Sequence, residues 1–229
     1  MVTRELAIAA AATLVTSYAV SEAVHLLEKR LGFVSVDAHK PGRVLVARSG
    51  GIAIMLSLLL SLVCWGAFVG TSIPTLVYIA SAVLAGLLGL VDDLVHLGVR
   101  SKLLLFCLPG LIPVAFHLYS PHPYVPGIGH LRLTIIYPLL VVAAFDVMAN
   151  AFNMSDTHNG LIVSAFLIFA ASLAVSTILP GPEPLEGFGP LLAISALVLL
   201  GYLPLNMYPA RMLNGNSGSH LVGALAASL

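Results

Sequence analysis

The sequence predicts an all-α protein, a polytopic bundle of transmembrane helices. Only 9% of the 229 residues are charged, 59% are hydrophobic, and the mean hydropathy is +1.03. Soluble domains carry about 25% charged residues, so this chain has too few charges to cover its surface toward water. The apolar residues also gather in stretches close to the length of about 20 residues that crosses a bilayer. The net charge of zero gives no indication of nucleic-acid binding through bulk electrostatics.

Seven stretches are long and apolar enough to span, and an eighth begins near the C-terminus. They cover residues 5–28, 51–70, 75–97, 103–120, 131–150, 160–179 and 189–207, and the eighth starts near His220. Because the eighth reaches only about ten residues before Leu229, we expect the sequence to be cut short or this helix to lie differently. No connecting loop exceeds about 20 residues, which predicts one integral membrane domain over residues 1–229.

The basic residues predict how the helices cross the membrane, because cytoplasmic loops carry an excess of Lys and Arg. With the N-terminus outside, the inner segments hold eight Lys and Arg residues, and the outer segments hold only Arg4 and Arg132. The first stretch has no convincing cleavage site and is interpreted as a helix that stays. We therefore expect a multi-pass protein of the plasma membrane, with any polar site on the cytoplasmic face.

Four polar segments interrupt the apolar pattern, all at predicted inner helix ends. Ionisable groups near membrane depth are costly and usually mark a functional site. The first segment contains Asp37, His39 and Lys40, followed by the pair Gly50 and Gly51. His39 and Lys40 are candidates for phosphate contacts, although a basic loop on anionic lipid explains them equally well. The glycine pair predicts a close backbone approach at the start of the second helix.

The second segment carries the adjacent carboxylates Asp92 and Asp93, with Lys102 shortly after them. Neighbouring carboxylates repel each other unless a cation or water holds them. Hard oxygen ligands of this kind suit Mg²⁺, which binds through one or two carboxylates and substrate phosphates. Lys102 can meet a phosphate as a point charge. The alternative is a solvated helix end with an ion pair inside the loop.

The third segment is rich in carboxamides. Asn150 and Asn153 are three residues apart and therefore share a helical face, and Asp146 lies four residues before Asn150. Together with Asp156 and Asn159, these groups can read the hydrogen-bonding edges of a sugar or of uracil and can ligate a metal. A polar cap shared by two helices is the alternative, and Asp146 is as consistent with a buried packing residue as with a site residue.

The fourth segment, residues 206–220, is a turn rich in Gly, Ser and Asn that leads into a helix. Backbone amides at such a turn and at a helix N-terminus favour phosphate. Arg211 is a further candidate for a phosphate contact, and Asn216 can approach a metal. An ordinary turn with an N-cap is the alternative.

At these residues the chain resembles the polyprenyl-phosphate N-acetylhexosamine-1-phosphate transferases, glycosyltransferase family 4. Its members include phospho-MurNAc-pentapeptide translocase and dolichyl-phosphate GlcNAc-1-phosphate transferase. The four segments match the family's motifs in order over nearly the whole chain: Asp37–Lys40 with Gly50-Gly51, Gly89–Asp93, Asn150–Gly160 and Tyr208–Ser219. Asn159 and the run Arg100-Ser101-Lys102 are most similar to the archaeal and dolichyl-like branch.

Two departures from the family pattern bear on its chemistry. Asn216 stands where the family has an aspartate that serves as a main Mg²⁺ ligand, and the segment from Asp156 to Gly160 keeps only the first carboxylate of the motif Asp-Gly-x-Asp-Gly. The family also has about ten spanning helices. Its late inner loop, which contacts substrate, would lie beyond Leu229.

The resemblance implies transfer of a sugar-1-phosphate, with GlcNAc-1-phosphate the first candidate, from a UDP-sugar to a polyprenyl or dolichyl phosphate. UMP is released, and the reaction is the first membrane step of glycan or glycoprotein precursor assembly. Mg²⁺ is the implied cofactor. The implied catalytic residues are Asp92, Asp93 and Lys102. The other implied site residues are the metal ligands Asn153 and Asn216, with Asp92 and Asp93, and the substrate-binding residues His39, Lys40, Asn150, Asn153, Asp156, Asn159 and Arg211.

Three alternatives stay open at this point. The first is a catalytically impaired or inactive relative, because of Asn216 and the missing C-terminal helices. The second is a phosphotransferase that uses a CDP-alcohol, which would need aspartates spaced at about four residues rather than an adjacent pair. The third is a transporter, which would place ionisable residues near mid-helix. The small-residue run Ala85–Gly89 can pack helices within one chain or in a homodimer.

Overall fold

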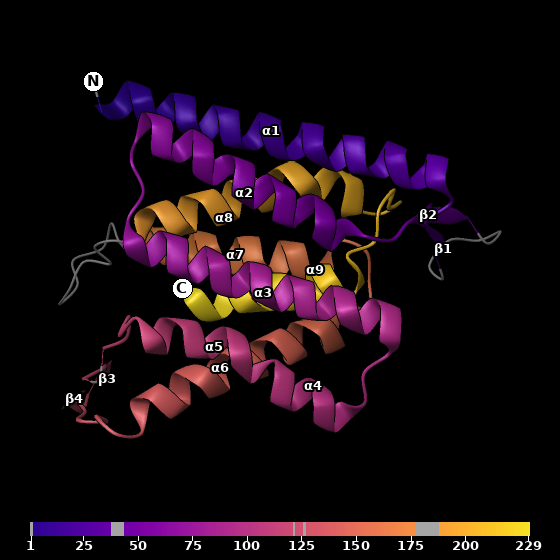
Figure 1. The fold of residues 1–229 in the computed structure, drawn as a ribbon. Helices are drawn as coiled ribbons and strands as arrows, with labels where there is room; N and C mark the ends of the chain where they lie inside the picture. Colours follow the sequence, from indigo (N-terminus) through magenta and orange to yellow (C-terminus); the bar gives the residue numbers. More distant parts are fainter. Residues whose placement is uncertain (1, 38–43, 121, 126, 177–187) are drawn as a thin grey trace.

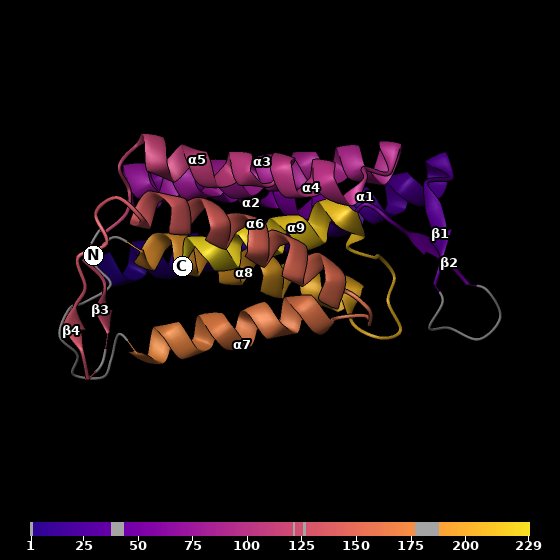
Figure 2. The same ribbon diagram turned by 90° about the horizontal axis from the view of Figure 1, so that it is seen from below.

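Long helices run back and forth along one direction in the computed structural model (Figures 1 and 2). The structure describes residues 2–37, 44–120, 122–125, 127–176 and 188–229. The helices are α1 (Val2–Leu31), α2 (Gly50–Phe68), α3 (Ile73–Val95), α4 (Val99–Leu105), α5 (Cys107–Ala115), α6 (Tyr137–Ser155), α7 (Leu161–Ser176), α8 (Gly189–Asn206) and α9 (Gly215–Ser228). Five of the helices in these ranges, α1, α2, α3, α6 and α8, are long and apolar enough to cross a membrane. The predicted all-α polytopic membrane protein is confirmed.

Two short antiparallel ribbons mark the two ends of the helix array (Figure 1). Strand β1 (Val34–Val36) pairs with β2 (Leu45–Ala47), with Val34 opposite Ala47. Strand β3 (Tyr124–Val125) pairs with β4 (Gly129–His130) between α5 and α6. The β1–β2 ribbon lies at the end where α1, α3, α6 and α8 finish and where α2, α7 and α9 begin. This is the end that carries the four polar segments.

Helix α9 lies at the centre of the array, between α3 on one side and α6 on the other (Figures 1 and 2). Every residue of α9 from Ser217 to Ala226 is buried. The peripheral helices show the opposite pattern, since Val63, Leu104 and Ile168 are 70%, 74% and 69% exposed. Large apolar side chains on the outside suit a surface that faces hydrocarbon rather than water.

The fourth predicted stretch, residues 103–120, is divided in the structure. Helix α4 starts earlier, at Val99, and the chain breaks at Phe106 before α5 begins. Pro109 explains the break, because it has no N–H to donate to the carbonyl of Leu105. The early start places Lys102 in the middle of α4, close to the end of α3.

Two other predicted boundaries were wrong by about one and a half helical turns. Helix α6 begins at Tyr137 rather than at residue 131, with Pro138 in its first turn, where the missing N–H costs nothing. It continues to Ser155, so Asn150 and Asn153 are both helical. Helix α9 begins at Gly215 rather than near His220. Asn216 therefore lies in the first turn of α9 and not in the preceding loop.

Candidate active site

A polar cavity of about 410 Å³ lies where α3, α6 and α8 end and α9 begins. All four polar segments contribute to it, including Arg48 from the segment before α2 and His96 from the end of α3. Its carboxylates and carboxamides are Asp37, Asp93, Asn153, Asp156, Asn159, Asn206, Asn214 and Asn216. The structure thus brings side chains that are far apart in the sequence to one place at one end of the bundle.

Asp92 is the most engaged carboxylate at this end of the bundle. It is 1% exposed, and its Oδ2 forms an ion pair with Nζ of Lys102 at 2.6 Å. The same Oδ2 accepts a hydrogen bond from Nδ2 of Asn216 at 2.7 Å, and Oδ1 accepts one from the backbone N–H of Leu97 at 2.8 Å. The buried charge of Asp92 is therefore compensated within the protein by one cation and two N–H donors.

Asp93 faces the N-terminus of α9. Its Oδ1 accepts the backbone N–H of Asn216 at 3.0 Å, and its Oδ2 accepts that of Ser217 at 3.1 Å. The first N–H groups of a helix have no partner within the helix, and the helix dipole favours negative charge there. Asp93 thus caps α9 from a different helix, which separates its role from that of Asp92.

The amide orientation of Asn216 follows from Asp92, because a carboxylate can only accept. With Nδ2 of Asn216 toward Asp92, its Oδ1 accepts from Nδ2 of Asn153 at 3.1 Å. Nδ1 of His220 lies 2.7 Å from the carbonyl of Asn216, so this nitrogen carries the ring proton and Nε2 accepts from Asn153 at 3.2 Å. The buried imidazole of His220 stacks on Phe106, with ring centroids 3.9 Å apart.

Two further carboxylate–carboxamide pairs line the cavity. Asn159 donates to Oδ2 of the buried Asp37 at 3.0 Å, and Asn214 donates to Oδ1 of Asp156 at 2.9 Å. Burial raises the pKa of Asp156 to about 6, and the hydrogen bond from Asn214 opposes this rise only in part. Each pair joins elements from different parts of the chain, so the cavity wall is cross-linked by side chains.

The backbone around Gly51 fixes the distance between α2 and α9. A Cβ on Gly51 would lie 2.4 Å from the backbone nitrogen of Gly218, so no side chain fits there. This confirms the close backbone approach predicted for the glycine pair. Next to it, β2 pairs with the segment before α9, since the carbonyl of Ala47 accepts the N–H of Leu213 at 2.8 Å.

Glu28, near the end of α1, supports the same region. Its side chain is 7% exposed, and Oε2 accepts the backbone N–H groups of Arg48 at 3.0 Å and Ser49 at 3.2 Å. Asn206, at the end of α8, bonds two backbone groups, the N–H of Gly160 at 3.1 Å and the carbonyl of Met212 at 3.0 Å. Glu28 holds the backbone before α2 in place, whereas Asn206 both lines the cavity and ties the end of α8 to the segments around it.

Some predicted site residues lie elsewhere. Asn150 does not line the cavity, and its Nδ2 donates to the carbonyl and to Oδ1 of Asp146, both at 2.9 Å. Arg211 also lies outside the cavity, where its Nη2 contacts Oε1 of Glu22 at 2.5 Å on an exposed surface. His39 and Lys40 fall outside the described residues. The structure brings together Asp93, Asn153, Asp156, Asn159 and Asn216 at the cavity. Asp92 and Lys102 do not line the cavity but join this group, because Asp92 contacts both Asn216 and Lys102.

Five residues that shape the site were not among the predicted ones: Glu28, Asp37, Asn206, Asn214 and His220. A signal was available for four of them, since Asp37 belongs to the first polar segment and Asn206, Asn214 and His220 belong to the fourth. Glu28 sits in a charged run at a helix end and looks like a solvated residue. The partners of all five are distant in sequence or are backbone groups, which no local pattern indicates.

The oxygen atoms of this site fit a hard divalent cation. Because both hydrogen bonds of Asn153 listed above use Nδ2, its Oδ1 is left as the atom that can face the cavity. Carbonyl oxygens keep a second lone pair, so Oδ1 of Asn216 can also act as a ligand. Mg²⁺ prefers oxygen ligands and commonly takes part of its shell from substrate phosphates. Asn153 and Asn216, with the carboxylate of Asp93, are the residues that would hold it.

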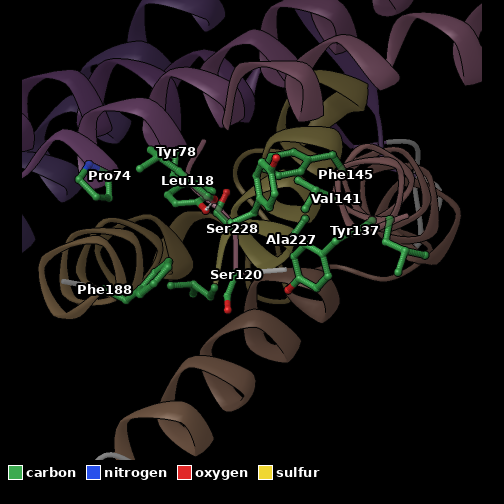
Figure 3. Close-up of a pocket in the computed structure, with 14 residues that line it drawn as sticks. Pro74, Tyr78, Leu118, Ser120, Tyr137, Val141, Phe145, Phe188, Ala227 and Ser228 are labelled. Carbon is green, nitrogen blue, oxygen red and sulfur yellow. Dashed lines mark hydrogen bonds between the residues drawn. The ribbon is translucent and has the colours of Figure 1, made fainter. Parts of the chain in front are cut away.

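A second, larger cavity of about 650 Å³ lies at the opposite end of the bundle (Figure 3). Aromatic and aliphatic side chains line it, with Tyr78, Tyr137, Phe145 and Phe188 around its wall. Tyr78 turns its hydroxyl to the carbonyl of Leu118 at 2.5 Å. Among the described residues that line it, none has an Asp, Glu, Asn or Gln side chain, so this cavity lacks the side-chain oxygens expected of a metal site.

Comparison with known proteins identifies the family of the chain. The family model for glycosyl transferase family 4 matches residues 75–229. A protein of Saccharolobus solfataricus, provisionally named UDP-N-acetylglucosamine–dolichyl-phosphate N-acetylglucosaminephosphotransferase, is 32% identical over 210 residues, which cover 88% of this chain and 63% of the relative. The phospho-N-acetylmuramoyl-pentapeptide-transferase of Deinococcus radiodurans is 31% identical over 196 residues, which cover 78% of this chain and 59% of the relative. The chain spans less than two thirds of the length of these relatives. From the match over more than half of its length, the chain belongs to glycosyl transferase family 4.

Proposed function

We propose that this chain transfers a sugar-1-phosphate, with GlcNAc-1-phosphate the first candidate, from a UDP-sugar to a polyprenyl or dolichyl phosphate and releases UMP. The observation that carries the proposal is the polar network around Asp92, Asp93, Lys102 and Asn216 at one end of a membrane helix bundle. The names of the two relatives support it, since both describe transfer of a phosphosugar or its peptide derivative.

We further propose that the polar cavity faces the cytoplasm of a plasma-membrane protein whose N-terminus is outside. Six basic residues of the described chain lie at or beside the cavity end of the helices: Lys29, Arg30, Arg48, Arg100, Lys102 and Arg211. Arg4 and Arg132 lie toward the opposite end. This distribution supports the orientation, because basic residues concentrate on the cytoplasmic side. It also gives the UDP-sugar access from water while the lipid acceptor enters from the bilayer.

The proposed reaction forms one phosphoanhydride bond and breaks another. An oxygen of the acceptor phosphate attacks the phosphorus atom attached to the sugar, and the bond between that phosphorus and UMP breaks. The acceptor monoester has a second pKa of about 6, so it is largely dianionic at neutral pH and needs no strong general base. The main obstacle is repulsion between two anions. A bound Mg²⁺ would supply charge neutralisation and stabilise the departing UMP.

The residues of this chain divide the remaining work. The ammonium group of Lys102 forms the ion pair with Asp92. Because it has three N–H donors, it can also donate to a phosphate. Asp93 holds the first turn of α9, so the backbone around Asn216 stays in place. Asn153, Asp156 and Asn159 offer hydrogen-bonding groups along the cavity wall, where the nucleotide or sugar can be read. The stacked, buried rings of Phe106 and His220 would exclude water from the side of the network next to Asn153 and Asn216.

The test is release of UMP from UDP-GlcNAc by the purified chain in detergent, with and without polyprenyl phosphate and with Mg²⁺ or EDTA. We expect release that needs both the lipid acceptor and the cation, and that falls by at least about a hundredfold in Asp92→Asn. Glu5→Gln is the matched control, because it neutralises an acid at the other end of α1. UMP release that does not require polyprenyl phosphate, or that persists in Asp92→Asn, contradicts the proposal.

A second candidate is a catalytically impaired relative, and Asn216 is the observation that favours it. An amide in place of a carboxylate removes one negative charge next to Asp92. If the wild-type chain binds UDP-GlcNAc without releasing UMP, and Asn216→Asp releases it, the impaired reading is correct. Equal UMP release by the wild type and by Asn216→Asp excludes a catalytically impaired relative.

A further inference from the structure

The charges around Asn216 are already balanced within the protein. The buried carboxylate of Asp92 has the ammonium of Lys102 at 2.6 Å and the amide of Asn216 at 2.7 Å. Both oxygens of Asp93 accept backbone N–H groups of α9. A free divalent cation that approached this point would have to compete with these donors for each carboxylate.

Asn216 determines which oxygen atoms an approaching cation would contact. Its Nδ2 is turned to Asp92, and its Oδ1 accepts from Asn153, so the oxygens left for a ligand on these two residues are neutral amide oxygens. Among the described residues, no group of three or more His, Cys, Asp and Glu side chains is arranged to hold a metal ion. Neutral oxygens attract a divalent cation far less than carboxylates do, because the Coulomb term is missing.

A nucleoside diphosphate would change this balance. Its phosphates bring negative charges and several hard oxygen ligands, which is how Mg²⁺ is commonly completed in phosphate-transfer sites. Arg48 lines the cavity and the ammonium of Lys102 lies beside it, paired with Asp92, so positive charges are available to receive those phosphates. The diphosphate would then supply anionic oxygen ligands for the cation, and the cation would neutralise the charge of the diphosphate.

We propose that Asn216 makes the cation site conditional, so that a divalent cation and a nucleoside diphosphate bind this cavity together and the cation does not bind by itself. The proposal rests on the proposed function for the identity of the nucleotide, the UDP part of a UDP-sugar. In Asn216→Asp we expect the cation to bind without the nucleoside diphosphate. The substitution would place two carboxylates within hydrogen-bond distance of each other, and such a pair requires a cation or a proton between them.

The test measures binding, not activity, on the purified chain in detergent. Mn²⁺ is the probe, because the EPR signal of free Mn²⁺ reports how much is bound, and a protein-free blank corrects for Mn²⁺ held by UDP in solution. For the wild type we expect UDP to raise the affinity for Mn²⁺ by about tenfold or more. Mn²⁺ must then raise the affinity for UDP by the same factor, since coupling between two ligands is reciprocal.

Asn216→Asp should bind Mn²⁺ without UDP about tenfold or more tightly than the wild type. Thr157→Asp is the matched control. Thr157 lines the same cavity, is exposed and bonds to Ser155 and His158 rather than to Asp92, so its substitution adds the same charge next to Asp156 and not next to Asp92. We expect this control to bind Mn²⁺ less tightly than Asn216→Asp does. The wild-type comparison with and without UDP remains decisive even if a variant does not fold.

Two results would overturn the proposal while leaving the proposed function in place. One is a wild-type protein that binds Mn²⁺ alone as tightly as Asn216→Asp does. The other is UDP binding that is equal in EDTA and in Mn²⁺. A wild-type protein that binds no UDP under any condition overturns both the inference and the proposed function, so the two failures are distinguishable.

Discussion

Nδ2 of Asn216, in the first turn of α9, donates to Oδ2 of Asp92, near the end of α3, over 2.7 Å. The contact joins the central helix of the bundle to the helix that packs most closely against it. It also sets the direction of the neighbouring amide of Asn153, because Asn216 with Nδ2 toward a carboxylate leaves Oδ1 to accept from Nδ2 of Asn153. Several measurable consequences depend on this bond and its neighbours.

Removal of the ammonium group from Lys102 should destabilise the protein. Lys102→Met leaves the buried carboxylate of Asp92 with N–H donors but without its cation, and we expect a loss of about 2 kcal/mol. Lys102→Arg retains the charge and should keep more than half of this stability. Thermal unfolding of the three proteins in one detergent checks the order. A Lys102→Met protein as stable as the wild type would show that Asp92 does not need its partner.

Asp93 should matter to stability through α9 rather than through the cavity. Asp93→Ala removes the acceptor for two N–H groups at the helix N-terminus, and loss of such a cap costs about 1–2 kcal/mol. Asp93→Asn should cost nearly as much, because its NH₂ group would face one of the two N–H donors. Thermal unfolding again provides the measurement. Hydrogen exchange that stays unchanged at Asn216 and Ser217 in Asp93→Ala would speak against the capping role.

Gly51 allows α2 and α9 to approach, and Gly51→Ala should separate them. The added Cβ would lie 2.4 Å from the nitrogen of Gly218, so the backbone must move. We expect a loss of about 2 kcal/mol and weaker UDP binding, since Asn216 moves with Gly218. Gly66→Ala is the control, because its Cβ would meet nothing closer than 3.9 Å. Similar melting temperatures for the two variants would refute the packing argument.

Asp156 should make stability depend on pH. Its pKa is about 6 in the folded protein because burial disfavours the charged form, and the ordinary pKa of an aspartate carboxyl is 3.8. Between these values the folded state holds the proton more tightly, so the free energy of unfolding falls as pH rises toward about 6, by up to about 3 kcal/mol. Asp156→Asn carries no titrating group and should lack this fall. The difference in melting temperature between the two proteins, followed from about pH 4.5 to about pH 7.5 so that the pKa of Asp156 is crossed, should shift in favour of the variant. A flat difference would exclude this assignment.

Much of the fold was accessible from composition and apolar length, because each spanning helix is a local feature. The boundaries that failed were those of α4, α6 and α9, where Pro109, Pro138 and the turn before Gly215 decide the start or the break. At the break between α4 and α5 and at the start of α6 the apolar pattern continues across the boundary, whereas α9 begins in the polar run Gly215–Ser219, before its apolar stretch. Proline and backbone geometry, not hydrophobicity, mark the end of the element there.

The site could be predicted less completely than the fold. Asp92, Asp93 and Asn153 were predicted from local clusters of polar residues, and the structure brings them together. Arg211 and Asn150 were selected for the same reason, yet their nearest partners, Glu22 and Asp146, lie outside the cavity. The sequence shows which residues can do the chemistry. Which of them face one another depends on contacts such as Asp37 with Asn159, which are 122 residues apart.

The separation of Asp92 from Asn216 along the chain also orders events during translation. Asn216 is made 124 residues after Asp92, which at ribosomal speed is an interval on the order of ten seconds. Through that interval the nascent α3 ends in two carboxylates whose permanent partners on α9 do not yet exist. Lys102 follows Asp92 by only ten residues and is made almost at once. The ion pair with Lys102 therefore compensates the charge of Asp92 at the end of α3 until α9 has been synthesised.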